Sequence, residues 1–73
     1  MTKTKKRDRQ FGKALANHVS AGRMSLDAAI AAIWCYAAVT YSQYPRQELA
    51  ISHARLALSD RMDYLQGPAW MVT

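Results

Sequence analysis

The feature that most constrains this chain is the uncharged run AAIAAIWCYAAV at residues 28–39. Strong helix formers dominate it, so we predict one helix from residue 26 to residue 42 or 43. The twelve residues of the run span about 18 Å as a helix, whereas the hydrocarbon core of a bilayer is about 30 Å thick. The run therefore predicts a buried helix of a globular protein. Because it is apolar on all sides, we expect it to be the central element.

Local signals predict a helix before this run. Asp8 can serve as the N-cap of a first helix over residues 9–21, because its carboxylate accepts backbone N–H groups of a first turn. Gly22 is well suited to the left-handed position just after that helix. Ser25 is the predicted N-cap of the central helix.

A third helix is predicted after the run. Pro45 ends the central helix and fits the first turn of the next, which we place over residues 46–66. A break at Ser59 is an alternative that would give a short fourth helix. Gly67 and Pro68 end the pattern.

The predicted fold class is all-α, a small array of three helices with a disordered basic N-terminal arm. A chain of 73 residues makes one domain, whose single core contributes only a few kcal/mol net. We divide the chain into a disordered basic arm (1–7), a helical domain (8–67) and a C-terminal tail (68–73).

The formal net charge of +5 comes entirely from the N-terminal segment. Residues 1–13 carry six basic groups and one acid, whereas residues 14–73 carry four arginines and four acids. Such asymmetry indicates an anionic partner near the segment; the alternative is a solubilising tail. The predicted contacts to nucleic acid or an acidic partner are Lys3, Lys5, Lys6, Arg7, Arg9 and Lys13.

The sequence shows no recognisable catalytic or metal-binding pattern. Cys35, His18 and His53 fall one in each predicted helix, whereas a metal needs three or four converging ligands. We therefore expect a core thiol and two boundary histidines, with no metal, no cofactor, no catalytic residue and no small-molecule ligand. The protein is not predicted to be an enzyme. The lone cysteine and the lack of a secretory pattern predict a cytoplasmic protein.

The aromatic residues divide into core and docking candidates. Trp34 and Tyr41 are seven residues apart, hence on one helix face, and we interpret both as core residues. Tyr44 at a turn and Trp70 on the tail offer large contact areas with few rotatable bonds, as binding anchors do. The predicted partner-docking residues are Arg23, Tyr44, Arg46 and Trp70.

A DNA-reading helix-turn-helix is an alternative, because polar residues of the third helix could face a groove. These residues are Arg46, Gln47, Ser52 and Arg55. The helix before Pro45 is long and apolar, however, and the connecting turn lacks the glycine often found there.

Several features of the whole chain resemble small phage-encoded regulators of host RNA polymerase, including the antitermination proteins of lytic phages. They are the length, the start TKTKKRDRQF, the middle rich in alanine and aromatic residues, and the lone cysteine. The resemblance implies a non-catalytic protein of the host cytoplasm that binds bacterial RNA polymerase, inhibits initiation and lets transcription pass terminators. It assigns no residue, because it includes no shared motif.

The leading hypothesis is therefore a small helical regulator that docks on RNA polymerase and holds its basic arm near nucleic acid. The alternative is a stand-alone helical module that binds DNA or RNA through phosphate contacts. An amphipathic protein that binds the membrane surface is a third hypothesis with less support, because only a short apolar stripe accompanies the basic residues. The partners we expect include neither a membrane nor a small molecule.

Overall fold

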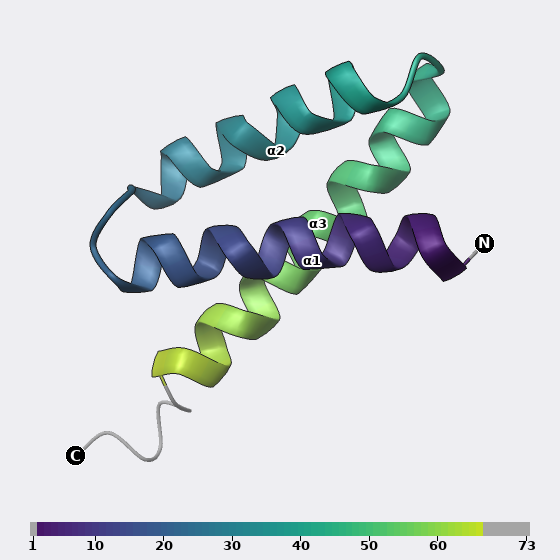
Figure 1. Ribbon diagram of the computed structural model, residues 1–73. Helices are drawn as coiled ribbons and strands as arrows, with labels where there is room; N and C mark the ends of the chain where they lie inside the picture. Colours follow the sequence, from purple (N-terminus) through teal and green to yellow (C-terminus); the bar gives the residue numbers. More distant parts are fainter. Residues whose placement is uncertain (1, 67–73) are drawn as a thin grey trace.

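The computed structural model describes residues 2–66, and the side chains of residues 5–65, as three α-helices. They are α1 (Thr2–Ser20), α2 (Leu26–Thr40) and α3 (Tyr44–Gln66), as Figure 1 shows. α1 and α2 run antiparallel, and α3 crosses behind α1 (Figure 1). The predicted all-α array of three helices is confirmed. The predicted tail, 68–73, lies outside the described residues.

The turn between α1 and α2 has the predicted glycine and N-cap. Gly22 has a φ of 77°, in the left-handed region that glycine favours. Its N–H donates to the carbonyl oxygen of Val19 at 3.0 Å. Ser25 Oγ accepts a hydrogen bond from the N–H of Ala28 at 3.1 Å, so both predictions are confirmed.

The turn between α2 and α3 lies earlier in the chain than expected. α2 ends at Thr40, because Tyr41 is extended, with φ −122° and ψ 133°. The side-chain amide of Gln47 donates to the Tyr41 carbonyl at 2.7 Å, which closes the turn. α3 begins at Tyr44, so Pro45 lies in its first turn, where a missing N–H costs nothing.

α1 begins earlier than expected. It starts at Thr2, so the helix extends through most of the segment predicted as an arm, 1–7. Asp8 lies in its second turn, and the prediction that Asp8 is an N-cap is wrong. Its buried side chain instead accepts hydrogen bonds from α2 and α3. α3 is continuous through Ser59, so the alternative with a break there is also wrong.

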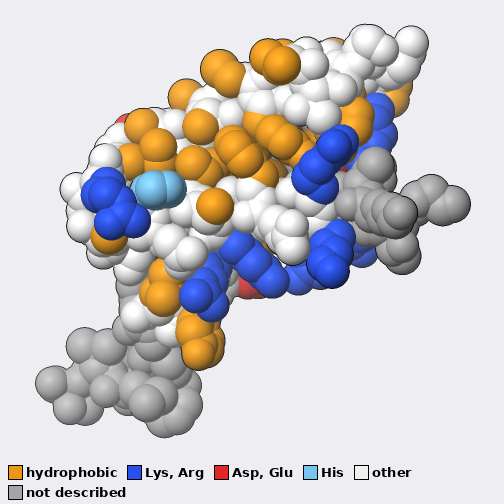
Figure 2. All heavy atoms as spheres, viewed as in Figure 1, with side chains coloured by type: hydrophobic (Ala, Val, Ile, Leu, Met, Phe, Trp, Pro, Cys, Tyr) orange, Lys and Arg blue, Asp and Glu red, His pale blue; other side chains and the backbone are white. Residues whose placement is uncertain are grey.

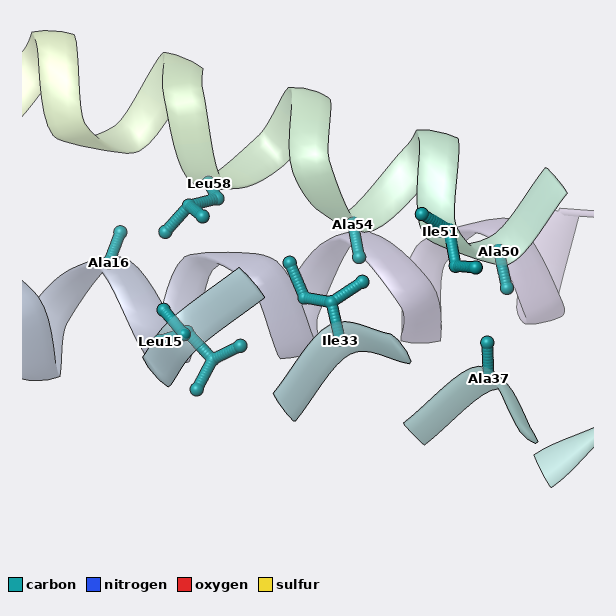
Figure 3. Close-up of a cluster of buried hydrophobic side chains, with 9 residues drawn as sticks. Leu15, Ala16, Ile33, Ala37, Ala50, Ile51, Ala54 and Leu58 are labelled. Atoms are coloured by element: carbon teal, nitrogen blue, oxygen red, sulfur yellow. The ribbon is translucent and has the colours of Figure 1, made fainter. Parts of the chain in front are cut away.

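The core between the helices is small and rich in alanine. Side chains of all three helices meet in it (Figure 3). Its buried members are Leu15, Ala16, Ala29, Ile33, Ala37, Ala50, Ile51, Ala54 and Leu58.

α1 and α3 approach closely at Gly12. A Cβ built there would overlap the backbone carbonyl of Ala54, so only glycine allows this crossing. α3 makes its most extensive contacts with α1, and α1 and α2 contact each other least. The central helix is therefore α3, and the prediction that the apolar run would be central is wrong.

α2 buries only one stripe of its apolar surface. Trp34 is 52% exposed and Cys35 is exposed, so the prediction that they are core residues is wrong. Tyr41 packs against the core, as expected. Within residues 2–66, no helix combines the length and apolar character that a membrane span requires. The buried stripe of α2 is Ala29, Ile33 and Ala37.

Candidate nucleic-acid interface

Four exposed basic side chains form what we call the basic face of α1: Lys5, Lys6, Arg9 and Lys13. Lys5, Arg9 and Lys13 recur every four residues, so they share one side of the helix. Together with Gln10 the four line an open hollow of ≈ 400 Å³. Figure 2 shows Lys and Arg side chains along the lower edge of α1. Among the described side chains, none of the four forms an ion pair.

The one acid in this basic segment, Asp8, points into the molecule. Its side chain is fully buried. The hydroxyls of Tyr36 and Tyr41 donate to Asp8 Oδ1 at 2.6 and 2.8 Å. Arg46 Nη2 of α3 donates to Oδ2 at 3.1 Å and forms an ion pair. The charge of Asp8 is therefore balanced by Arg46 inside the protein and does not offset the charge of the basic face.

The surroundings of Asp8 shift two pKa values. Burial raises the pKa of the Asp8 carboxyl, but the hydrogen bonds from Tyr36, Tyr41 and Arg46 outweigh it, so the pKa lies below its usual value. Burial and the hydrogen bond to Asp8 raise the pKa of the Tyr36 hydroxyl. Asp8 is thus held ionised, and Tyr36 is held neutral as a donor.

Arg46 and His53 complete this group, which we call the Asp8 cluster. The Arg46 guanidinium carbon lies 4.1 Å from the centroid of the Tyr41 ring, as in a cation–π contact. His53 Nδ1 lies 3.8 Å from Asp8 Oδ2, which makes an ion pair only when the imidazole is protonated. Arg46 Nη1 and His53 Nδ1 are buried without a hydrogen-bond partner in the described part of the chain.

A second hollow joins the basic face to α3. It measures ≈ 420 Å³, and Lys5 and Arg9 line it from α1. Because these two cations line both hollows, the basic face of α1 directly adjoins the surface of α3. The lining residues from α3 are Ser52, His53, Leu56 and Asp60.

On its other side, α3 borders a hollow with two aromatic side chains, which we call the aromatic hollow. It measures ≈ 540 Å³ and is lined by Trp34 of α2 and Tyr44 at the start of α3. Ser52 and Leu56 line this hollow as well as the basic one, so the two hollows adjoin along α3. The other lining residues are Glu48, Ile51, Arg55 and Ser59.

The structure brings together most, but not all, of the predicted anion-contact residues. Arg7 is exposed on α1 but does not line the hollow of the basic face. The side chain of Lys3 lies outside the described residues. Lys5, Lys6, Arg9 and Lys13 are brought together.

The predicted docking residues are not brought together. Arg23 is exposed in the turn after α1, and its Nε donates to His18 Nδ1 at 3.0 Å. Tyr44 is 65% exposed in the aromatic hollow. Arg46 is paired with Asp8 inside the fold, with 26% of its side chain exposed, and its role in docking stays a prediction. Trp70 lies outside the described residues.

Two of the four side chains proposed to contact DNA bases form hydrogen bonds within the fold instead. Arg46 is paired with Asp8, and the Gln47 amide is bonded to the Tyr41 carbonyl. Only Ser52 and Arg55 remain exposed. This pattern disfavours base reading by the start of α3.

The sequence analysis did not predict that Asp8 is a buried ion. It also did not predict that Trp34, Ser52 and Leu56 line a hollow at the surface. A lone acid within a basic run was the available signal for Asp8. Its partners lie 28, 33 and 38 residues away, and no local pattern joins them. Among residues 2–66, no three His, Cys, Asp or Glu side chains lie close enough to hold a metal ion.

In comparisons with known proteins, the chain matches no family model, no curated protein and no solved structure.

Proposed function

We propose that this protein is a non-catalytic regulator that binds bacterial RNA polymerase and modulates transcription, with α1 facing nucleic acid. The observation that carries the proposal is the uncompensated basic face of α1. Because Asp8 is paired with Arg46 inside the fold, the exposed charge of this segment is wholly positive. A positive surface on a formed helix attracts phosphates without needing base-specific contacts.

Exposed apolar side chains support a protein partner as well. Leu26 of α2 is 49% exposed and lines a hollow of ≈ 330 Å³ together with Ile30 of α2 and Met62 of α3. Neighbouring apolar side chains that remain accessible in one hollow are typical of an interaction surface. RNA polymerase offers both a protein surface and nucleic acid, and the resemblance to phage regulators makes it the first candidate, in the host cytoplasm. By the same resemblance, inhibition of initiation and passage through terminators are the outcomes we expect.

A pulldown of purified bacterial RNA polymerase, with and without a nucleic-acid scaffold, tests the proposal. We expect the tagged protein to retain the polymerase, and retention to be stronger with the scaffold. The double variant Lys5→Glu/Arg9→Glu should lose the gain from the scaffold. The matched control, Arg23→Glu/Arg61→Glu, makes the same change in net charge at two residues that line neither hollow of the basic face and should keep the gain. Failure to retain polymerase subunits at low salt would refute the proposal.

In vitro transcription tests the regulatory outcome. A template with a promoter and an intrinsic terminator reports initiation and read-through in one reaction. We expect fewer initiated transcripts and a larger read-through fraction with the wild-type protein than without it. Unchanged amounts of both products would contradict a regulatory role, even if the polymerase is bound.

A stand-alone nucleic-acid module is the second candidate, favoured by the preformed arrangement of the basic face. Four bound phosphates give a log–log salt slope of roughly −3 to −4. Binding of bare DNA or RNA with such a slope, without any retention of polymerase, supports this candidate. Lack of binding to either nucleic acid at low salt excludes it.

A further inference from the structure

We infer that a single strand of nucleic acid binds across the exposed surface of α3. Its phosphates lie on the side that faces α1, and its bases stack on Trp34 and Tyr44. This inference rests on the proposed function and names the nucleic acid that the basic face would meet. The ridge is formed by Ser52 and Leu56, which line both hollows. A strand that crosses it would contact both hollows at once.

The α1 side of the ridge suits phosphates. Lys5 and Arg9 supply two cations, and Ser52 of α3 adds a hydroxyl donor. Asp60 lines the same hollow and opposes an anion. Removing its charge should therefore tighten binding more than the same change at Asp27, an exposed acid that lines neither hollow, and this difference distinguishes a phosphate site in this hollow from general attraction to the positive segment.

The α2 side of the ridge suits bases. Trp34 and Tyr44 are 52% and 65% exposed in one hollow. Nonspecific single-strand sites combine a positive groove with aromatic rings on which bases stack. Both parts occur here on adjoining surfaces.

A single strand fits this arrangement better than a duplex. Bases within a duplex are stacked on one another, so they cannot also stack on Trp34 or Tyr44. Arg46 and Gln47, two of the four polar groups considered for groove reading, are hydrogen-bonded inside the fold. The surface thus offers phosphate and stacking contacts in place of groove reading by the start of α3.

Fluorescence anisotropy with labelled oligo(U), oligo(dT) and a duplex, each of about 12 nucleotides or base pairs, tests the inference. We expect both single strands to bind at least tenfold tighter than the duplex at the same salt. The ratio between oligo(U) and oligo(dT) distinguishes RNA from DNA as the preferred strand. Equal binding of duplex and single strands would overturn the inference.

Two aromatic variants test stacking. Trp34→Ala and Tyr44→Ala should each weaken single-strand binding roughly 10-fold or more, the loss typical of one stacked base. Tyr64→Ala removes a still more exposed aromatic side chain outside both hollows and should bind like wild type. Trp34→Phe, which keeps a ring, should retain most of the affinity, and far-UV circular dichroism checks that each variant is folded. Wild-type binding by Trp34→Ala and Tyr44→Ala would overturn the stacking of bases.

Charge variants test the phosphate side. Lys5→Gln/Arg9→Gln should weaken binding and reduce the salt slope by about 1.4, at 0.7 for each lost phosphate contact. Asp60→Asn should bind several-fold tighter than wild type. If neither change alters the affinity, the phosphates do not lie in this hollow and the inference is overturned.

Quenching of the Trp34 fluorescence is a second test of whether a base stacks on this side chain. In a Trp70→Phe background, Trp34 is the only tryptophan, and a stacked base should quench its fluorescence as the strand is added. No quenching at saturating strand would contradict the placement of bases on Trp34. If the strand binds as described but the polymerase is not retained, the proposed function fails and this inference stands; the converse result rejects the inference alone.

Discussion

The two sides of α3 differ in how closely their neighbours approach. On the α1 side, Gly12 lies against the backbone of Ala54, and the buried Asp8 is paired with Arg46. On the α2 side, Trp34 is half exposed beside an open hollow of ≈ 540 Å³. We conclude that the α1 side carries most of the stability of the fold. The α2 side leaves apolar and aromatic surface exposed.

The largest effect should come from Asp8→Ala, which breaks the ion pair on the α1 side. Removing one partner of a buried pair strands the other charge, at a typical cost of 3–5 kcal/mol. We expect about 3 kcal/mol here, because Arg46 keeps some solvent contact. Urea unfolding followed by circular dichroism measures the loss.

Asp27→Ala is the matched control for this variant. Asp27 is an exposed acid in the first turn of α2, where its interaction with the helix dipole contributes about 0.5 kcal/mol. Equal losses in the two variants would contradict a special role for Asp8.

A smaller loss should follow from Gly12→Ala. Alanine is the better helix former by about 1 kcal/mol, yet its Cβ would collide with the Ala54 carbonyl. We expect a net destabilisation of about 1–3 kcal/mol, as for other overpacked sites. The urea midpoint measures it, and an unchanged or increased midpoint would show that α1 and α3 are not in close contact there.

Acid should weaken the same side of α3. The pKa of Asp8 is lowered in the folded state by Tyr36, Tyr41 and Arg46, which outweigh burial. Its stabilisation is therefore complete above the unfolded value of about 3.9 and is lost as the pH falls through the folded pKa. Urea midpoints at neutral pH and at pH about 3 should fall less in Asp8→Asn than in wild type.

High pH should also lower the stability of the fold, through Tyr36 rather than Asp8. The raised pKa of Tyr36 means that its stabilisation is complete below about pH 10 and is lost at higher pH. Tyr36→Phe should remove this alkaline dependence. A Tyr36→Phe variant that loses stability with base as steeply as wild type would refute the assignment.

The smallest effect on stability should come from Trp34→Ala on the α2 side. Because the side chain is half exposed, we expect a loss of about 1 kcal/mol or less. A loss as large as that of Asp8→Ala, measured in the same urea experiment, would abolish the contrast between the two sides of α3.

The helix ends were predictable because their signals are local. Gly22 and Ser25 each act within a few residues, through a left-handed turn and an N-cap. The start of α1 was predicted too late in the chain because an aspartate can act as a helix N-cap or as a buried ion, and we assigned the first role to Asp8. Its partners are brought near only by the folded chain.

The exposure of Trp34 could not be predicted from the periodicity of α2. Hydrophobic spacing shows that a helix is apolar all round, but not which neighbours will cover it. Gly12 and the alanines of α3 let α1 approach α3 closely. Which helices cover one another therefore depends on these small residues and not on the apolar pattern of α2. The basic residues were found from composition, whereas their arrangement on one face required the helix to begin before them.

The pairing of Asp8 with Arg46 also bears on how the protein is made. The two residues are 38 positions apart, and a ribosome adds about 5–20 residues per second. The first helix therefore waits about 2–8 seconds before its main partner has been synthesised. The buried ion pair therefore cannot form while α1 is being made, and α1 gains its most extensive contacts only once α3 has been synthesised.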